Sequence, residues 1–246
     1  MTTRKVQNPN SKGNTAFLWA VIAVLAIAAL VIGLIVNNGR NNQKAAAEAE
    51  MVKMDGINVT WNEGEDTIHL AGANPKADAN EGDLFEDFSC SYCAKYHIAT
   101  DADMLELVKD GDITMNLRMM VGQDRGTVGH STKSTAAFLA LLAHGDVDAA
   151  FTLRNYLYEN QQQVYNNVDE TKLADLAKSY GASNAALQDI RDAKYIDAAM
   201  KMSGDNAKLQ QDTSGEAWTP RVLIDGEDLY ADGNLTETWP ADLAAR

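Results

Sequence analysis

The sequence predicts an α/β domain with a helical insertion, preceded by an N-terminal transmembrane helix. Three observations support this: an uncharged apolar run, an alternation of strand-like and helical segments after it, and a series of consecutive amphipathic helices inside that alternation. We expect these parts: a short cytoplasmic tail at 1–16, a transmembrane anchor at 17–36, a linker at 37–56, and a domain at 57–246 with its helical insertion at about 127–210.

The apolar run at residues 17–36 reads FLWAVIAVLAIAALVIGLIV and carries no charge. Such a helix, at about 1.5 Å per residue, spans roughly 30 Å of hydrocarbon. A cleaved signal peptide is the main alternative, but its apolar part usually has about 7 to 15 residues. Basic residues are slightly more frequent before the run than after it. We therefore expect a single-pass protein of the cell membrane with its domain on the extracytoplasmic side.

Residues 37–56 are polar and then rich in Ala and Glu, which is typical of a tether. The whole chain has 35 acidic against 21 basic residues and a formal net charge of −14. This charge repels phosphate backbones, so we exclude nucleic acid as a partner.

The first half of the domain alternates strands with one helix. Residues 57–61 and 67–70 alternate in polarity across a turn and predict a hairpin. Residues 82–89 are strand-like and aromatic, and a helix follows them until Gly111. Residues 113–121 are the next predicted strand.

From about Ser131 the chain changes to successive amphipathic helical stretches. After them, Trp218-Thr219-Pro220 leads into the strand-like residues 221–224. The turn Asp225-Gly226 follows, with Leu229-Tyr230 as the expected partner strand.

The only two cysteines of the chain form the motif Cys90-Ser91-Tyr92-Cys93. They lie where a predicted strand ends and a helix begins. Unpaired N–H groups and the macrodipole at a helix N-terminus favour a thiolate, so we expect a lowered pKa for Cys90, which makes it the nucleophile. Cys93, one turn inside the helix, is the expected resolving thiol.

Other uses of this spacing fit the sequence less well. Covalent haem attachment needs a His directly after the second Cys, where Ala94 stands. Zinc needs two further ligands, and only His97 shares a helix face with Cys93. We therefore expect no metal and no cofactor, and we expect His97 to be a partly exposed helix residue.

A Thr-Pro before a strand is weak evidence alone, but it gains meaning beside the cysteine motif. Over about residues 66–230 the chain resembles the DsbA-like branch of the thioredoxin superfamily. The resemblance rests on Glu86-Asp87-Phe88-Ser89 before Cys90-Ser91-Tyr92-Cys93, the helical insertion, and Thr219-Pro220-Arg221-Val222-Leu223-Ile224-Asp225-Gly226. It implies a thioredoxin-like fold, disulfide exchange with exported proteins, and a cis Pro220 that faces the cysteines.

The sequence departs from the family pattern at two positions. Many members have proline after the first cysteine, where this chain has Ser91, so the oxidising strength of those members cannot be assigned to this chain. Many also carry an acid for proton transfer where this chain has Leu84. Glu86 and Asp87 are candidates to replace it, and strand alternation puts only Glu86 on the side of Leu84. The simpler expectation is that both acids are solvated.

The expected function is that of an enzyme that oxidises exported polypeptides as a monomer and is reset by a membrane redox partner. Thr219, Pro220 and the ring of Tyr92 are the expected substrate contacts, although Tyr92 also fits an exposed spacer. The alternatives are a reductant of extracytoplasmic disulfides and a redox-silent module that binds extended peptides at the Pro220 edge.

Overall fold

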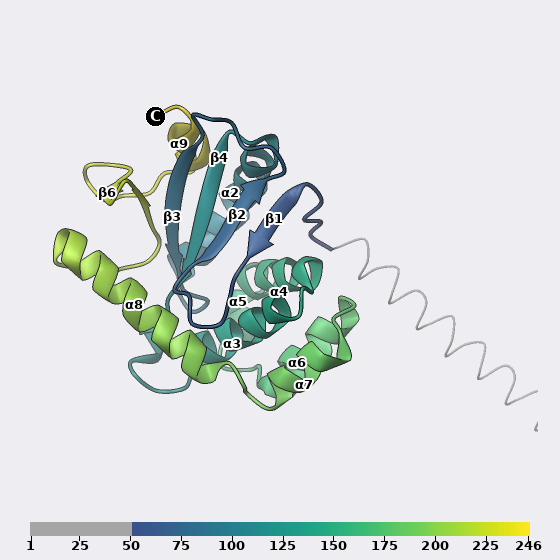
Figure 1. Cartoon of the computed structure of the whole chain (residues 1–246). Coiled ribbons are helices and arrows are strands. Elements are labelled where there is room, and N and C mark those ends of the chain that lie inside the picture. The colour runs from purple at the N-terminus through teal and green to yellow at the C-terminus, as the bar shows by residue number, and fades with distance from the viewer. Residues whose placement is uncertain (1–50) are drawn as a thin grey trace, which may run out of the picture. The chain divides into compact units, whose positions relative to one another are not determined.

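The computed structural model describes residues 51–246 (Figure 1). The predicted cytoplasmic tail, the transmembrane anchor at 17–36 and residues 37–50 of the linker lie outside the described residues. Within 51–246, no helix combines the length and the apolar character needed to cross a membrane.

A six-stranded mixed sheet forms the centre of the described domain, in the order β1-β2-β4-β3-β5-β6. Its strands are β1 (Ile57–Thr60), β2 (Ile68–Gly72), β3 (Asn80–Glu86), β4 (Ile113–Met119), β5 (Arg221–Ile224) and β6 (Glu227–Asp228). The hairpin predicted from residues 57–61 and 67–70 is confirmed as the antiparallel pair β1–β2. Among the strands of residues 51–246, only β3 and β4 pair in parallel.

The central strand β3 positions the site. It pairs with β4 on one side and antiparallel with β5 on the other, with Phe85 opposite Arg221. The end of β3 therefore lies beside the start of β5. Because the cysteines follow β3 and Thr219-Pro220 precede β5, this register brings the two motifs together.

Helix α2 (Ser91–Asp110) follows directly after Cys90. It ends at Gly111, whose left-handed backbone (φ 78°) lets its N–H bond to the carbonyls of Leu107 and Val108. A Cβ at Gly111 would come 2.6 Å from the Asn74 carbonyl oxygen. Glycine is therefore required here both for its conformation and for the close approach.

The helical insertion lies between β4 and β5. It contains η1 (Gly122–Asp124), α3 (His130–Ala143), α4 (Val147–Glu159), α5 (Gln161–Val164), α6 (Glu170–Ser179), α7 (Asn184–Arg191) and α8 (Ile196–Ser214). Figure 1 shows α3 to α7 gathered beyond one end of the strands. Helix α3 is buried along almost its whole length, and α4 packs against α2. The insertion thereby covers one face of the helix that carries the cysteines.

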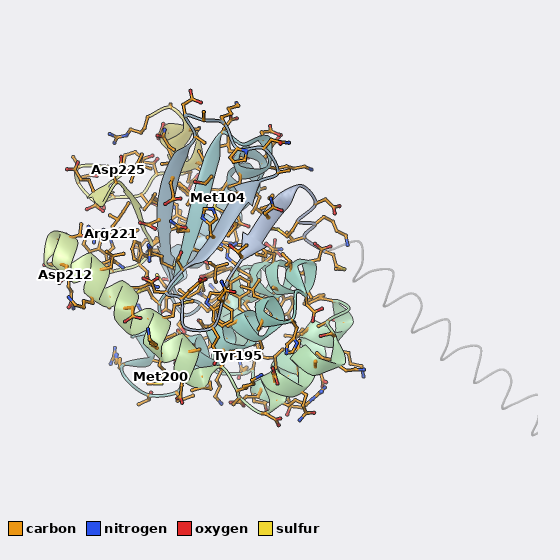
Figure 2. All side chains as sticks on the ribbon, viewed as in Figure 1. Met104, Tyr195, Met200, Asp212, Arg221 and Asp225 are labelled. Atoms are coloured by element: carbon orange, nitrogen blue, oxygen red, sulfur yellow. The ribbon has the colours of Figure 1, made fainter. Side chains whose placement is uncertain are left out.

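Helix α8 returns the chain to the sheet. Arg221 is the first residue of β5 (Figure 2), and its side chain donates to Gln210 of α8 and forms an ion pair with Asp228 of β6. Its guanidinium also lies 3.9 Å from the ring centroid of Trp218. These contacts fix the segment that leads into Thr219-Pro220.

The structure corrects several predicted boundaries. The predicted strand 82–89 ends at Glu86, and the strand partner of β5 is Glu227–Asp228 rather than Leu229-Tyr230. A short C-terminal helix, α9 (Trp239–Ala244), was not predicted. It is held because the buried Trp239 indole donates to the Thr100 hydroxyl at 2.9 Å.

Residues 51–56 also differ from their assignment to the linker. The Val52 N–H donates to the Thr152 hydroxyl and the Met54 N–H to Asp148, each at 3.0 Å. The Met54 side chain is buried. The packed chain therefore begins before Ile57, because this segment bonds to α4 and buries the Met54 side chain.

Candidate active site

Cys90 caps the N-terminus of α2. Its backbone is extended (φ −80°, ψ 116°), and its sulfur accepts a hydrogen bond from the Cys93 N–H at 3.4 Å. Both cysteines are free thiols and similarly enclosed, with exposed fractions of 5% for Cys90 and 3% for Cys93. The Cys90 sulfur thus occupies the position where unpaired helix N–H groups favour negative charge.

The two thiols have opposite acidities. A hydrogen bond from the Cys93 thiol lowers the pKa of Cys90 to about 6, although burial acts in the other direction. Burial raises the pKa of Cys93 well above its ordinary value, and its hydrogen bond to Cys90 adds to this. At neutral pH Cys90 is therefore mostly thiolate and Cys93 a thiol. The lowered pKa predicted for Cys90 is confirmed.

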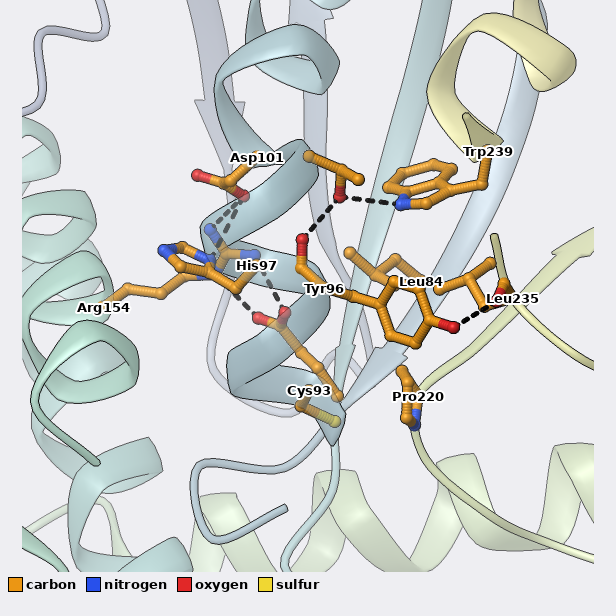
Figure 3. Close-up of a pocket in the computed structure, with 11 residues that line it drawn as sticks. Leu84, Cys93, Tyr96, His97, Asp101, Arg154, Pro220, Leu235 and Trp239 are labelled. Carbon is orange, nitrogen blue, oxygen red and sulfur yellow. Dashed lines mark hydrogen bonds and ion pairs between the residues drawn. The ribbon is translucent and has the colours of Figure 1, made fainter. Parts of the chain in front are cut away.

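Thr219-Pro220 lies against the cysteines, as the register of β3 and β5 requires. The peptide bond is cis, which confirms the predicted isomer. The Thr219 carbonyl oxygen lies 3.3 Å from the Cys90 sulfur, and Pro220 lines a small cavity together with Cys93 (Figure 3). Tyr92 is 65% exposed, so its ring is available at the surface between the two cysteines.

Asp87 is buried, so the expectation of a solvated charge was wrong. Its carboxylate accepts from the N–H groups of Ser89 at 2.8 Å and Gln123 at 3.1 Å, and from the Ser131 hydroxyl. Burial raises the pKa of this carboxyl. Its backbone N–H points to the Cys93 sulfur at 3.5 Å. The side chain of Asp87 therefore fastens the end of β3 to the insertion.

Glu86 is also buried, which again contradicts the solvated expectation. Its two carboxylate oxygens accept from Arg154 Nε at 2.7 Å and Nη2 at 2.8 Å. Arg154 Nη1 donates to Asp101 at 2.6 Å. The alternation argument was right, because Leu84 and Glu86 line the same cavity as Cys93. Of the two acids, Glu86 is the one whose side chain faces the resolving cysteine.

His97 is buried rather than partly exposed, which corrects another expectation. Its Nε2 lies 2.9 Å from Asn155 Oδ1, and its ring packs on Tyr158 with 4.7 Å between centroids. Both partners belong to α4. The sequence showed His97 on the face of α2 that carries Cys93, but it gave no sign that an inserted helix covers that face.

Sequence reasoning missed several residues that support the site. Gln161 Nε2 donates to the carbonyls of Phe88 at 2.8 Å and Cys90 at 3.0 Å. Two of these residues could have been found from the sequence, because Arg154 interrupts an apolar stretch of α4 and Asp101 follows His97 by one helical turn. No sequence pattern pointed to Gln161. Within residues 51–246, no group of three or more His, Cys, Asp or Glu side chains is arranged to hold a metal ion.

A nucleophilic thiolate, a neighbouring thiol that can displace a bound partner, and an adjacent peptide edge support thiol–disulfide exchange. Fold and site together define a thiol-disulfide oxidoreductase with a thioredoxin-like domain. The chain belongs to the thioredoxin family, since the sequence model described as Thioredoxin matches residues 70–239.

Two similar solved structures are MdbA thiol-disulfide oxidoreductases. That of Corynebacterium diphtheriae has 33% identity and a TM-score of 0.73, covering 80% of this chain and 98% of its own. That of Corynebacterium matruchotii has 30% identity and the same TM-score, covering 82% and 98%. Reduced DsbA from Mycobacterium tuberculosis shares the fold at 16% identity and a TM-score of 0.52, covering 74% and 98%. A search of curated proteins found no match. This protein is an enzyme of the same kind, a DsbA-like thiol-disulfide oxidoreductase.

Proposed function

We propose that the protein is an oxidant that introduces disulfides into exported polypeptides through Cys90 and Cys93. The observation that carries this direction is the pKa of Cys90, lowered to about 6 by the Cys93 hydrogen bond. A stabilised thiolate favours the reduced pair, so the disulfide form gives up its oxidising equivalents more readily. At pH 7, a shift from 9.0 to about 6 contributes about 1.4 kcal/mol, or about 30 mV.

The exchange proceeds in two displacements. A substrate thiolate attacks the Cys90 sulfur of the disulfide, and Cys93 leaves with the electron pair and takes up a proton. A second thiolate of the substrate then attacks the substrate sulfur in this mixed disulfide, and Cys90 leaves as a thiolate. Two electrons pass to the cysteine pair, and the substrate gains its disulfide.

Substrate binds as an extended segment beside Thr219 and Pro220. Support comes from the Thr219 carbonyl, 3.3 Å from the Cys90 sulfur, since a peptide that pairs there brings its own cysteine to the nucleophile. Tyr92, which lies between the two cysteines in the sequence, adds an exposed ring. Glu86, which faces the Cys93 cavity, is the candidate for proton transfer, whereas the Asp87 carboxylate is committed to three hydrogen bonds.

The proposed setting is the extracytoplasmic side of the cell membrane. The enzyme would be a monomer anchored through residues 17–36, and a membrane redox partner would reoxidise its cysteines. The uncharged apolar run at residues 17–36 and the basic residues that precede it support this setting.

The test is the equilibrium potential of Cys90–Cys93 in the full chain against a glutathione buffer, together with refolding of a reduced substrate protein. An oxidant should lie nearer to about −120 mV than to about −270 mV, the values of a strong oxidant and a typical reductant. The oxidised enzyme, added in an amount stoichiometric with the thiols of the reduced substrate protein, should also restore the activity of that substrate protein. A potential at the reducing end would make the protein a reductant. No exchange by wild type and by Cys90→Ser alike would favour the redox-silent binding module.

A further inference from the structure

A short turn at residues 87–90 links β3 to α2 and carries the nucleophile. The Cys90 N–H closes the turn by donating to the Asp87 carbonyl at 2.9 Å. The Asp87 carboxylate accepts from the Ser89 N–H at 2.8 Å, and the Ser131 hydroxyl of α3 bonds to the side chains of Asp87 and Ser89. None of these contacts holds the carbonyl groups of Phe88 and Cys90.

Gln161, the first residue of α5, holds both of those carbonyl groups. Its side-chain nitrogen Nε2 has two hydrogens, and it donates to the Phe88 carbonyl at 2.8 Å and to the Cys90 carbonyl at 3.0 Å. The side chain is buried, so little water competes for these bonds. The Cys90 carbonyl also accepts from the Ala94 N–H at 3.1 Å, in the first turn of α2. One amide group therefore spans the turn and reaches the residue that caps the helix.

The position of Gln161 is itself fixed by the end of α4. The carbonyl of Asn160, the residue that caps α4, accepts from the Gln163 N–H at 2.8 Å, which attaches the first turn of α5. The Phe88 ring stacks on Tyr158 of α4, with 5.0 Å between centroids. The same end of α4 thus holds the side chain of Phe88 and, through Gln161, its carbonyl group.

The acidity of Cys90 depends on where its sulfur lies. The hydrogen bond from the Cys93 thiol contributes most to lowering the pKa to about 6, burial opposes it, and the N–H groups of Cys93 and Tyr92 and the contact with Thr219 add to it. The Cys93 nitrogen lies 3.4 Å from the sulfur. Because hydrogen bonds weaken steeply as their distance and angle depart from the optimum, a small displacement of the Cys90 backbone removes stabilisation from the thiolate.

We propose that Gln161 is a positioning residue for the nucleophile: its amide holds the backbone of Phe88 and Cys90 so that the Cys90 sulfur stays over the first turn of α2. This inference rests on the proposed function, in which Cys90 is the nucleophile. Gln161 acts through the backbone and not on the sulfur itself. The helical insertion, which is remote from the cysteine motif in the sequence, thereby controls the reactivity of that motif.

Gln161→Met tests this role, because methionine has a similar length and no donor. Iodoacetamide labelling of Cys90 is measured on the full-length reduced protein from pH 5 to pH 9. We expect the pKa of Cys90 to rise from about 6 to about 7, since one net hydrogen bond corresponds to about one pH unit. Relative to the maximal rate of each protein, labelling at pH 5 should then be about 10-fold slower in the variant.

Gln163→Met is the matched control. It makes the same substitution on the same short helix, at a position whose side chain is exposed, and its labelling profile should match that of the wild type. A wild-type profile in Gln161→Met would overturn the proposal. Equal labelling of Cys90 and Cys93 in Gln161→Met would also overturn it, because a general loosening of α2 would then explain the effect.

Hydrogen-exchange NMR on the wild type keeps the proposal testable if Gln161→Met does not fold. The side-chain amide of Gln161 should exchange with deuterium more slowly than that of the exposed Gln163, and equal rates would overturn the proposal.

The equilibrium with glutathione separates this inference from the proposed function. At pH 7 a rise in the Cys90 pKa from about 6 to about 7 should move that equilibrium about fivefold towards the disulfide form. Wild type that exchanges disulfides, with neither the labelling profile nor this equilibrium changed in Gln161→Met, defeats the inference alone. Wild type with no exchange defeats the proposed function instead.

Discussion

The two cysteines of the site differ in acidity although their exposed fractions are nearly equal. Burial raises the pKa of Cys93, and polar partners separate the two thiols further: the Cys90 sulfur accepts from the N–H and the thiol of Cys93, whereas Cys93 is itself the donor. The hydrogen bond between the two thiols therefore stabilises the Cys90 thiolate and disfavours a Cys93 thiolate. This coupling assigns the roles of nucleophile and resolving thiol without a charged residue in the first turn of α2.

The first prediction follows from that assignment. Cys93→Ala should leave a nucleophile that attacks substrate but is not released, so mixed disulfides should accumulate on non-reducing gels. Cys90→Ala should trap none. In the wild type, iodoacetamide should label Cys90 first, with half the maximal rate near pH 6, because the lowered pKa maintains the thiolate above that pH and loses it below. Equal labelling of both thiols would contradict the assignment.

The second prediction concerns Arg154. Arg154→Leu leaves the carboxylates of Glu86 and Asp101 buried without their cation, so we expect a loss of about 3–5 kcal/mol of unfolding free energy. Arg191→Leu, which breaks the exposed pair with Asp175, should cost less than about 1 kcal/mol. Both values come from urea denaturation at pH 7.

At acidic pH the difference in unfolding free energy between Arg154→Leu and the wild type should become smaller. Burial by itself raises the pKa of Asp101, but Arg154 and His97 overcome it and hold that pKa below 3.8 in the wild type. The wild type therefore keeps this contribution until the pH falls below that value. In Arg154→Leu no cation opposes the effect of burial, so the buried carboxylates of Glu86 and Asp101 take up protons at higher pH than in the wild type. If the loss of unfolding free energy became larger as the pH fell, this account would be contradicted.

At the level of single residues, the sequence predicted the chemistry of the cysteine motif better than its surroundings. The helix-capping position of Cys90 follows from local pattern alone, and so does the shared side of Leu84 and Glu86. The burial of Glu86, Asp87 and His97 does not. It depends on α3 and α4 of the insertion, whose packing partners are distant in the sequence.

At the level of elements, helix α2 carries the nucleophile at its start and is closely packed at its end. The helix starts at the nucleophile and ends at Gly111, which lies against the Asn74 backbone. The start and the end of α2 were both predicted, since a cysteine after a strand and a glycine after an apolar period are local signals. Helix α9 was missed because its few residues carry little periodicity. They are held by contacts with α2 and β3 instead.

The third prediction tests the end of α2. Gly111→Ala forces a side chain into a left-handed backbone and places its Cβ 2.6 Å from a carbonyl oxygen. Gly181→Ala has a similar φ of 83° and no atom within 4 Å of the added Cβ. We expect about 1–2 kcal/mol of destabilisation at Gly181 from the conformation alone, and a clearly larger loss at Gly111. Equal losses in thermal or urea unfolding would mean that the neighbouring segment moves aside.

At the level of the whole molecule, the site is assembled from three segments that are remote in sequence. The β3–α2 junction supplies the thiols, the insertion supplies Arg154 and Gln161, and the segment that leads into β5 supplies Thr219. The α/β class and the presence of an insertion were predictable from periodicity. Which face of α2 the insertion covers was not, because that depends on how several amphipathic helices share one core.

The start of the folded chain is also a property of the whole molecule. Residues 51–56 were predicted as linker, yet Val52 and Met54 attach this segment to α4 through two backbone hydrogen bonds and one buried side chain. Burial of a Met side chain contributes about 1.5–3 kcal/mol, and each hydrogen bond adds about 1 kcal/mol. Ordering the segment offsets part of this sum.

The fourth prediction compares two shortened chains. A chain that begins at Ala47 should be soluble and monomeric, because it lacks the apolar run but keeps the segment that packs on α4. A chain that begins at Ile57 should be less stable by about 3 kcal/mol in urea, since it loses the contacts of Val52 and Met54. Met54→Ala in the longer chain should reproduce most of that loss. If both chains unfold at the same urea concentration, the contacts of residues 51–56 add nothing to stability, and the boundary at Ile57 is restored.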